Sequence, residues 1–362
     1  MNPVLDCYLK RKNFSSYEEF MENYQIEVPE HFNFGYDVVD KWADLEPDKQ
    51  ALLWCNDEFR LESFTFAEAK KLTNQAANAF IKAGIKKGDV VMLILKQRPE
   101  AWWCITALCK IGAICIPATF QLTAKDIIYR CNIANVKMIV AVDEEDVIQH
   151  IQDARDKCED LRTVALVGDK KAENCLSFRD EMNRVSEDLE RIRNNSTDPM
   201  LIYFSSGTSG MPKMVLHDHT LALGHIVTAL YWQQVQNNAV HMTQTDSGWA
   251  KFAWGKIYGQ WICGAAIGAY DTAGFSPESM LKAIETIRPT TFCAPATIYR
   301  YLIKEDLSTA DFSFIKHASV AGEPLNPEVY HQIRQKTGLA IHEGFGQSEG
   351  SVLLANFGWD EI

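Results

Sequence analysis

The loop that decides the fold of this chain is Tyr203-Phe-Ser-Ser-Gly-Thr-Ser-Gly-Met-Pro-Lys213. Its hydroxyl side chains offer short hydrogen bonds to phosphate oxygens, and its glycines let backbone N–H groups approach a phosphate without a Cβ in the way. Lys213 adds a compact positive charge. This composition predicts a polyphosphate-binding loop, whose candidate residues are Ser205, Ser206, Gly207, Thr208, Ser209, Gly210 and Lys213.

Apolar runs flank the loop on both sides. Met200-Leu-Ile-Tyr-Phe204 leads into it and Met214-Val-Leu216 follows it, which is the strand-and-loop context that a phosphate loop needs. The Walker A loop of P-loop NTPases is excluded, because it ends in Gly-Lys-Ser/Thr, whereas Pro212 precedes the lysine here. A Ser/Gly-rich surface turn with a chance lysine would explain the composition but not these flanking runs.

Strand-like and helix-like runs alternate along most of the chain. Val90–Leu95, Ala113–Pro117 and Val136–Val142 are strand-like, Pro99 and Gly112 bracket a helix-like segment, and Thr123 begins another. This order predicts a doubly wound unit and an α/β fold with largely parallel sheets.

A second segment near the end of the chain is Glu343-Gly-Phe-Gly-Gln-Ser-Glu349. Together with Ser205–Lys213 it resembles the two signature motifs of the adenylate-forming (AMP-binding) superfamily, which includes acyl-CoA synthetases, luciferases and the adenylation domains of peptide synthetases. Ala321–Leu325 resembles the segment that lies along the adenine. Thr245–Trp249 and Ala294–Arg300 are most similar to the medium-chain acyl-CoA synthetases. The resemblance covers essentially the whole chain.

The resemblance implies the large N-terminal domain of the adenylate-forming fold, with two layered α/β subdomains. We expect one AMP-binding domain over residues 1–362, incomplete, with a subdomain at about 30–185 and another at about 198–362 that carries the phosphate loop and the adenine motif. The family's β-rich C-terminal subdomain and mobile lid have no counterpart in this sequence. We therefore expect the N-terminal portion of such an enzyme, whose lid could be a separate polypeptide.

The resemblance also implies the reaction and the roles of individual residues. A carboxylate attacks the α-phosphorus of ATP to give acyl-adenylate, and the acyl group then passes to CoA. Ser205–Lys213 would hold the β- and γ-phosphates, and Phe345 would stack on adenine opposite Gly322, Glu323 and Pro324. The remaining ATP-binding candidates are Glu343, Gly344, Gly346, Gln347 and Ser348.

Three of these candidates are expected to be catalytic: Lys213, Ser348 and Glu349. The Ser348 hydroxyl would bond the α-phosphate or the substrate carboxylate, and Glu349 would bind Mg²⁺ with the Thr208 hydroxyl close to the same phosphates. Two plainer alternatives stay open from the residues alone. Glu349 could be an ordinary carboxylate at a helix N-terminus, and Phe345 could belong to the core.

An apolar slot is expected for the tail of the carboxylic acid. Trp249 is the first candidate for this substrate-binding pocket, and Trp254 is a weaker one. His217, His219 and His225 follow the phosphate loop and suggest a metal site, but His217 and His219 are only two residues apart with no cysteine near. We expect these histidines to support the phosphate loop instead.

Composition limits the functional class of the protein and its cellular compartment. The 36 Lys and Arg against 48 Asp and Glu give a net charge of −12, which disfavours a sequence-independent nucleic-acid binder. The ten cysteines form no Cys-x-x-Cys pair, a usage typical of a reducing compartment. No apolar run is long enough to span a membrane, and the N-terminus fits neither a secretory signal nor a transit peptide. We therefore expect a cytoplasmic protein.

Three functions remain open. The first is an AMP-forming acyl-CoA synthetase of the medium-chain type, with ATP, Mg²⁺, a carboxylic acid and CoA. The second is a module that binds ATP or acyl-adenylate without turnover, or half of a split enzyme. The third is an adenylating enzyme that passes the acyl group to a carrier protein.

Overall fold

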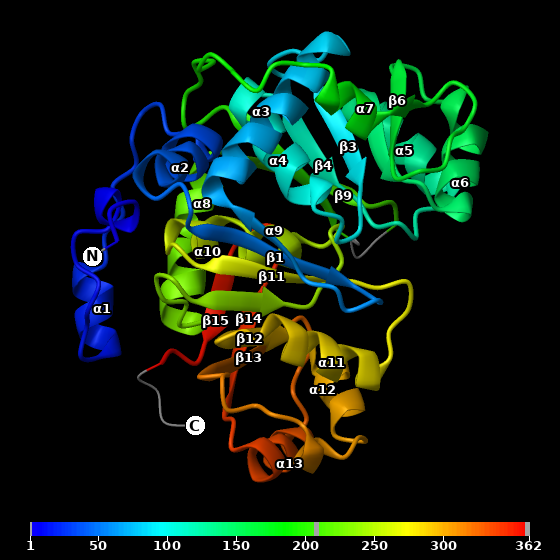
Figure 1. The fold of residues 1–362 in the computed structure, drawn as a ribbon. Coiled ribbons are helices and arrows are strands. Elements are labelled where there is room, and N and C mark those ends of the chain that lie inside the picture. Colours follow the sequence, from blue (N-terminus) through cyan, green and yellow to red (C-terminus); the bar gives the residue numbers. More distant parts are fainter. Residues whose placement is uncertain (1, 206–209, 359–362) are drawn as a thin grey trace.

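The computed structural model describes residues 2–205 and 210–358. Its frame consists of a seven-stranded sheet with the order β7-β6-β5-β3-β4-β8-β9 and an eight-stranded sheet with the order β15-β14-β13-β12-β10-β11-β1-β2 (Figure 1). Within the described residues, neighbouring strands are parallel except for the pairs β1–β2, β8–β9 and β14–β15, each at a sheet edge. The predicted α/β fold with mostly parallel sheets is confirmed.

The bounds of the elements are as follows. The strands are β1 (Gln50–Asn56), β2 (Glu62–Thr65), β3 (Val90–Ile94), β4 (Ile114–Pro117), β5 (Val136–Val142), β6 (Thr163–Val167), β7 (Leu176–Ser177), β8 (Pro199–Ser205), β9 (Lys213–Asp218), β10 (Val240–Thr243), β11 (Ala266–Asp271), β12 (Thr291–Ala294), β13 (His317–Ala321), β14 (Ile341–Gly346) and β15 (Val352–Ala355). The α-helices are α1 (Tyr17–Asn23), α2 (Lys41–Leu45), α3 (Phe66–Lys82), α4 (Glu100–Ile111), α5 (Ala124–Ala134), α6 (Glu145–Arg155), α7 (Phe178–Asn183), α8 (Thr220–Gly224), α9 (Ala250–Lys256), α10 (Tyr258–Ile262), α11 (Pro277–Ile287), α12 (Ala296–Leu302) and α13 (Pro327–Thr337).

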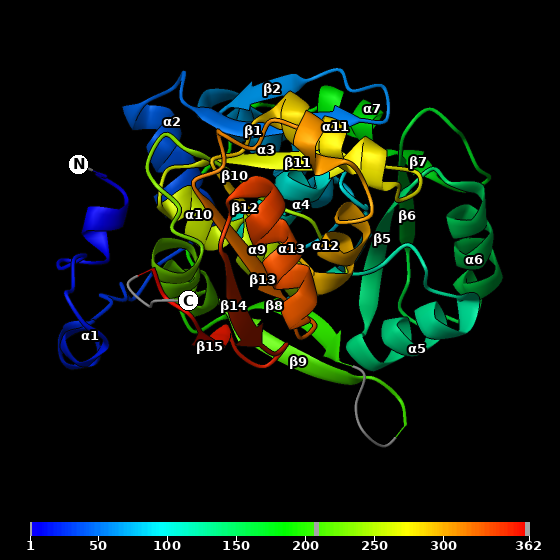
Figure 2. The ribbon, with the colours of Figure 1, turned by 90° about the horizontal axis from the view of Figure 1, so that it is seen from below.

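Helices cover the sheets in layers. α3, α4, α9 and α10 lie between the two sheets in one large apolar cluster, α5 and α6 cover the outer face of the seven-stranded sheet, and α11–α13 cover the outer face of the eight-stranded sheet (Figures 1 and 2). β3 shows why: Val91 and Leu93 pack into the central cluster, whereas Val90 and Met92 pack toward α5 and α6. Successive side chains of a strand point to opposite faces of the sheet. A strand that is apolar at every position, such as β3, is therefore buried on both faces.

The two sheets exchange segments of the chain. β1 pairs with β11 and so joins β2 to the sheet built mainly from residues beyond 240, whereas β8 pairs with β4 and brings β9 into the sheet of residues 90–177. The phosphate-loop strands therefore belong to the first sheet, and sheet membership does not follow the expected boundary between about 185 and 198. The cause is long-range pairing, which leaves no local mark in a sequence.

Local signals placed several elements correctly. Thr123 caps α5 through Asp126, and the Asp126 carboxylate accepts the Thr123 N–H in return. Pro99 precedes α4, and Gly112 ends it with a φ of +69°, a left-handed conformation that favours glycine. The predicted strands Val90–Leu95, Ala113–Pro117 and Val136–Val142 are confirmed as β3, β4 and β5 to within a residue at their ends.

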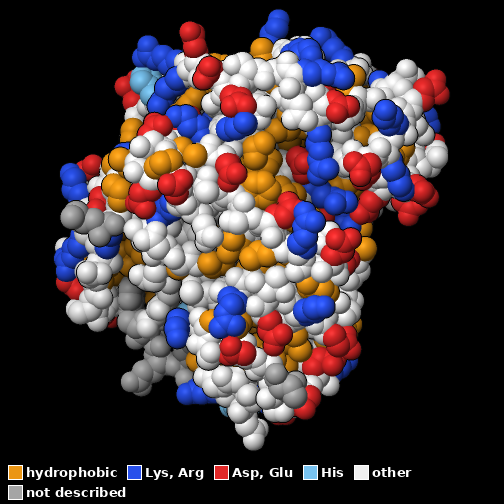
Figure 3. All heavy atoms as spheres, in the orientation of Figure 1, with side chains coloured by type: hydrophobic (Ala, Val, Ile, Leu, Met, Phe, Trp, Pro, Cys, Tyr) orange, Lys and Arg blue, Asp and Glu red, His pale blue; other side chains and the backbone are white. Residues whose placement is uncertain are grey.

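The cysteines and the surface complete the description. All ten cysteines are free thiols, and most are buried. On the face shown in Figure 3, acidic and basic side chains are interspersed, with no broad field of one sign. Within the part of the chain that the structure describes, no helix combines the length and the apolar character needed to cross a membrane.

Candidate functional site

The two motifs occupy equivalent places in the two sheets. The phosphate loop joins the edge strand β9 to β8, and Ser205 lies opposite Lys213 across the strand pair. Gly210 has a φ of +135°, and Tyr129 of α5 donates a hydrogen bond to the backbone oxygen of Pro212, with an O–O distance of 2.8 Å. The candidates Ser206, Gly207, Thr208 and Ser209 lie outside the described residues.

The adenine motif lies at the carboxyl ends of β13 and β14. These strands are parallel, with Ala321 opposite Gly344, so the residues that follow each strand meet at one edge of the sheet. Gly322 turns the chain away from β13 with a φ of +101°. A side-chain oxygen of Glu343 accepts the Leu325 N–H at 3.1 Å, which ties the segment after β13 to β14.

A cavity of about 500 Å³ opens between these two strand ends. Phe345 forms part of its wall and is 51% exposed, so the alternative that Phe345 belongs to the core is wrong. Residues 322–324 and 343–346, which the sequence predicts to surround the adenine, all line this cavity. Its lining is Gly322, Glu323, Pro324, Glu343, Gly344, Phe345, Gly346, Leu354, Ala355 and Asn356.

The glycines of β14 are required by close packing. A Cβ on Gly344 would lie 2.5 Å from the Trp232 ring, and one on Gly346 would lie 2.7 Å from the Ser351 backbone oxygen. Both distances are shorter than real Cβ contacts, so a side chain at either position would displace the strand. Because both neighbours of Phe345 lack side chains, its ring is free to stack on a flat ligand.

A second cavity of about 480 Å³ adjoins the first. The two share Gly322, Glu323 and Gly346 as lining residues. Trp249 and Trp254, the residues predicted for an acyl pocket, both line the second cavity, and Trp249 is 66% exposed whereas Trp254 is buried. The other lining residues are Thr245, Asp246, Ala250, Lys251, Pro295, Ala321, Gln347 and Ser348.

Two charged residues of this cavity were missed by the sequence analysis. Lys251 is nearly enclosed, and its Nζ donates to the Ala321 backbone oxygen at 2.6 Å. Burial lowers the pKa of Lys251 and raises the pKa of Asp246. The available signal was a lysine inside the largely apolar run that follows Trp249, where a charge is costly unless it serves a purpose.

The strand that follows the phosphate loop contacts the adenine motif through a histidine. His217 of β9 has its Nε2 2.7 Å from the backbone oxygen of Ser348, in the turn between β14 and β15. Figure 2 shows β14 and β15 beside the β8–β9 hairpin. Lys213 lies four residues from His217 along the same strand, about 13 Å at strand spacing. The fold thus brings together segments that are more than a hundred residues apart.

The other two histidines do not join His217. His219 and His225 are buried, and burial lowers their pKa values to about 4 and about 3. In residues 2–205 and 210–358, no three His, Cys, Asp or Glu side chains form a group that could hold a metal ion. Only His217 reaches the predicted site, where it contacts the adenine motif.

Glu349 lies in an exposed turn between β14 and β15. It does not begin a helix, so the alternative that it is a helix N-terminal carboxylate is wrong. A single exposed carboxylate fits Mg²⁺, which keeps several waters and is commonly bound by one or two carboxylates together with substrate phosphates.

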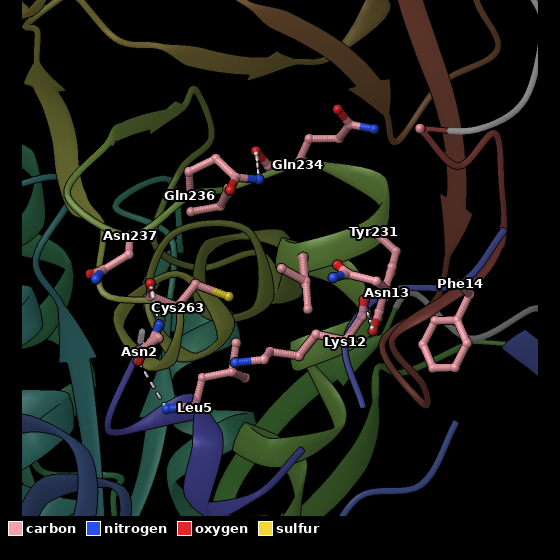
Figure 4. A pocket seen from close by; sticks show the side chains of 13 residues that line it. Asn2, Leu5, Lys12, Asn13, Phe14, Tyr231, Gln234, Gln236, Asn237 and Cys263 are labelled. Atoms are coloured by element: carbon pink, nitrogen blue, oxygen red, sulfur yellow. Dashed lines mark hydrogen bonds between the residues drawn. The ribbon is translucent and has the colours of Figure 1, made fainter. Parts of the chain in front are cut away.

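Another cavity, of about 470 Å³, lies between the N-terminal segment and the region around Tyr231 (Figure 4). None of the residues predicted for the site lines it. Asn2 uses its amide within the fold, because it donates to the Cys263 backbone oxygen and accepts the Leu5 N–H. This cavity is separate from the two that contain the motif residues.

Comparisons with known proteins agree with this arrangement. A family model described as AMP-binding enzyme matches residues 39–361. The mitochondrial acyl-coenzyme A synthetase ACSM4 of Homo sapiens is 37% identical over 343 residues, which are 92% of this chain and 59% of that protein. The mitochondrial ACSM3 of Homo sapiens is 35% identical over 354 residues, 96% of this chain and 60% of that protein. This chain thus spans about 60% of the length of these relatives.

Solved structures share the fold. The acyl-CoA synthetase of Brucella canis superimposes with a TM-score of 0.82 at 24% identity, covering 92% of this chain and 60% of that one. The anthranilate CoA ligase AuaEII, solved with anthranoyl-AMP, gives a TM-score of 0.85 at 21% identity and covers 92% of this chain and 64% of that one. The matched family model covers residues 39–361, which is most of the chain. This chain belongs to the AMP-binding enzyme family.

Proposed function

We propose that this chain binds ATP and a carboxylic acid side by side and joins them as an acyl-adenylate, the first half-reaction of an AMP-forming acyl-CoA synthetase of the medium-chain type. One observation carries the proposal. The cavity lined by the adenine motif and the cavity lined by Trp249 and Trp254 share Gly322, Glu323 and Gly346. A base in the first and an acyl tail in the second would direct their reactive ends toward the same segment.

The residues of this segment have distinct tasks in the proposed reaction. A carboxylate oxygen of the acid attacks the α-phosphorus, and the bond from that phosphorus to the oxygen bridging to the β-phosphate breaks, releasing pyrophosphate. Ser348 lines the second cavity, where its hydroxyl is suited to hold the α-phosphate or the acid. Lys213 and the phosphate loop stabilise the charge of the leaving pyrophosphate. Catalysis would thus come from positioning and charge stabilisation.

Mg²⁺ would neutralise phosphate charge when bound, and Glu349 is the residue that would hold it, together with the Thr208 hydroxyl. CoA is the proposed acceptor of the acyl group, by analogy with the names of the relatives. Their names also include a mitochondrial location, whereas we propose a cytoplasmic one, which is supported by a cysteine usage typical of a reducing compartment. Imaging of a carboxyl-terminally tagged chain would test the cytoplasmic location that we propose.

The proposal is tested by exchange of labelled pyrophosphate into ATP with a panel of carboxylic acids. The assay runs on this chain alone and with a second polypeptide that comprises the part of ACSM4 that this chain does not cover. Exchange that depends on a medium-chain acid in either arm supports the proposal. Tight ATP binding without exchange in both arms would favour a binding module instead. Exchange followed by acyl transfer to a carrier protein but not to CoA would favour the third function.

A further inference from the structure

One buried cation has no role in the chemistry above. Lys256 ends α9, and its side chain is completely enclosed, with 0% exposure. Its ammonium group donates to the side-chain oxygen of Gln97 and to the backbone oxygen of Thr243, the latter at 2.8 Å. Both acceptors are neutral, and the Trp102 and Phe252 rings lie against the ammonium at 5.4 and 5.6 Å.

A lysine in this environment is unfavourable for stability. Burying a charge beside neutral partners costs free energy that hydrogen bonds recover only in part, and a methionine would fill the same space without that cost. Burial also lowers the pKa of Lys256 to about 7. A structural role alone is therefore a poor explanation for the lysine.

The connection of Lys256 to the candidate site runs through Gln97. Its side-chain N–H donates to the Thr245 backbone oxygen at 2.8 Å, and its own backbone oxygen accepts the Trp54 indole N–H at 2.8 Å. A protonated lysine can only donate, so the Lys256 ammonium requires the amide oxygen of Gln97 to face it. The amide nitrogen is then forced to face Thr245. Lys256 thus fixes the orientation of the amide that holds Thr245.

Thr245 and its neighbour Asp246 line the second cavity. The loop that they begin is tightly packed, because a Cβ on Gly248 would lie 2.1 Å from the Thr119 backbone nitrogen. The same lysine anchors α9, since its backbone oxygen accepts the Trp102 indole N–H at 3.1 Å. The lysine side chain thus supports the loop that begins at Thr245 through Gln97, while the backbone of the same residue fixes the end of α9.

We propose that Lys256 is a positioning residue for the acyl group: through Gln97 it holds Thr245 and Asp246 in the wall of the second cavity, and it thereby sets the affinity for the acid without affecting the nucleotide. This inference rests on the proposed function, because it requires the second cavity to hold the acyl tail.

The test compares two ligands by titration calorimetry on the whole chain. One is AMP, and the other is a stable octanoyl-adenylate mimic in which a sulfamate replaces the phosphate, so the change in the ratio of their dissociation constants from parent to variant reports on the acyl group. In Lys256→Met we expect the mimic to lose about tenfold in affinity, the effect of one positioned hydrogen bond, while AMP binding stays within twofold. Gln97→Glu should give the same result, because glutamate still accepts from Lys256 but no longer donates to Thr245.

Lys110→Met is the matched control. Lys110 is also completely enclosed, but it bonds Asp40 at 2.6 Å together with Thr73 and Asn74 and lines neither cavity. The Lys110→Met protein should be less stable than the parent, but the ratio of its dissociation constants for AMP and the mimic should be unchanged. If Lys256→Met does not fold, the ratio measured for Gln97→Glu alone tests the inference. A normal ratio in folded Lys256→Met and Gln97→Glu overturns the inference, whereas a wild-type chain that binds neither ligand overturns the proposed function.

Discussion

Glu349, one of the residues expected to be catalytic, is exposed in the turn that follows β14. Glu349→Gln keeps the shape of the side chain and removes its charge. We expect the Mg²⁺-dependent part of ATP binding to fall about tenfold, because a charge-assisted contact contributes roughly 1.5–3 kcal/mol. ATP titrations with Mg²⁺ and with a chelator measure this part. Glu328→Gln, an exposed carboxylate on α13, serves as the control, and an unchanged Mg²⁺ dependence in Glu349→Gln would remove the assigned role.

Individual residues differed in how far the sequence could predict them. Phe345 is predicted from its motif position and Trp249 from the need for an apolar slot, and both line cavities. Lys251, Asp246 and Lys256 were not identified, because their importance arises from burial beside residues that are distant in the sequence. A charged residue in an apolar run is a signal that something needs it, but the sequence does not tell which partner.

Among the elements, β14 carries most of the adenine motif, and its position depends on Gly344. Gly344→Ala would place a Cβ 2.5 Å from the buried Trp232 ring. We expect a loss of about 1–3 kcal/mol in unfolding free energy from overpacking, together with weaker AMP binding as the strand shifts. Urea unfolding and AMP titration measure the two effects.

Gly274→Ala is the control for this change, because nothing lies within 4 Å of its Cβ position and its φ is not positive. It should be close to neutral in both measurements. A Gly344→Ala protein that is as stable as the parent would show that Trp232 can move aside and that β14 is less constrained than its packing indicates.

Secondary structure was largely predictable, and strand order was not. Capping at Thr123, the end of α4 at Gly112 and the apolar runs of β3 and β5 are local features, written within a few residues. The pairing of β1 with β11 joins residues about 215 positions apart, such as Leu52 and Ile267. Nothing local specifies such a pair, which is why the sheets exchange segments against the expected boundary.

For the whole molecule, pH should affect stability through four buried histidines. Burial lowers the pKa of His219 and His317 to about 4 and of His225 and His241 to about 3, from an ordinary value near 6.5. The unfolded chain therefore binds protons between pH 6.5 and 4 that the folded chain does not. Stability is complete above pH 6.5 and is lost as the pH falls toward 4.

From this difference we expect each of these histidines to cost about 2 kcal/mol of unfolding free energy between pH 7 and pH 5. Urea unfolding at the two pH values measures the sum. His241→Gln should reduce the difference, because this ring is bonded to Thr291 and Gly255 in the interior, whereas the exposed His331→Gln should not. Equal stability of the parent at both pH values would contradict the assignment.

The central claim is that the phosphate loop and the adenine motif bind one nucleotide. Titration of ATP and AMP into the parent chain, Lys213→Ala and Phe345→Ala tests it most directly. We predict that Phe345→Ala weakens both nucleotides by a similar factor of about ten, since stacking on a base contributes roughly 1–3 kcal/mol. Lys213→Ala should weaken ATP by about tenfold and leave AMP within twofold, because only ATP carries the distal phosphates. An ATP affinity that is unchanged in either variant would contradict the claim.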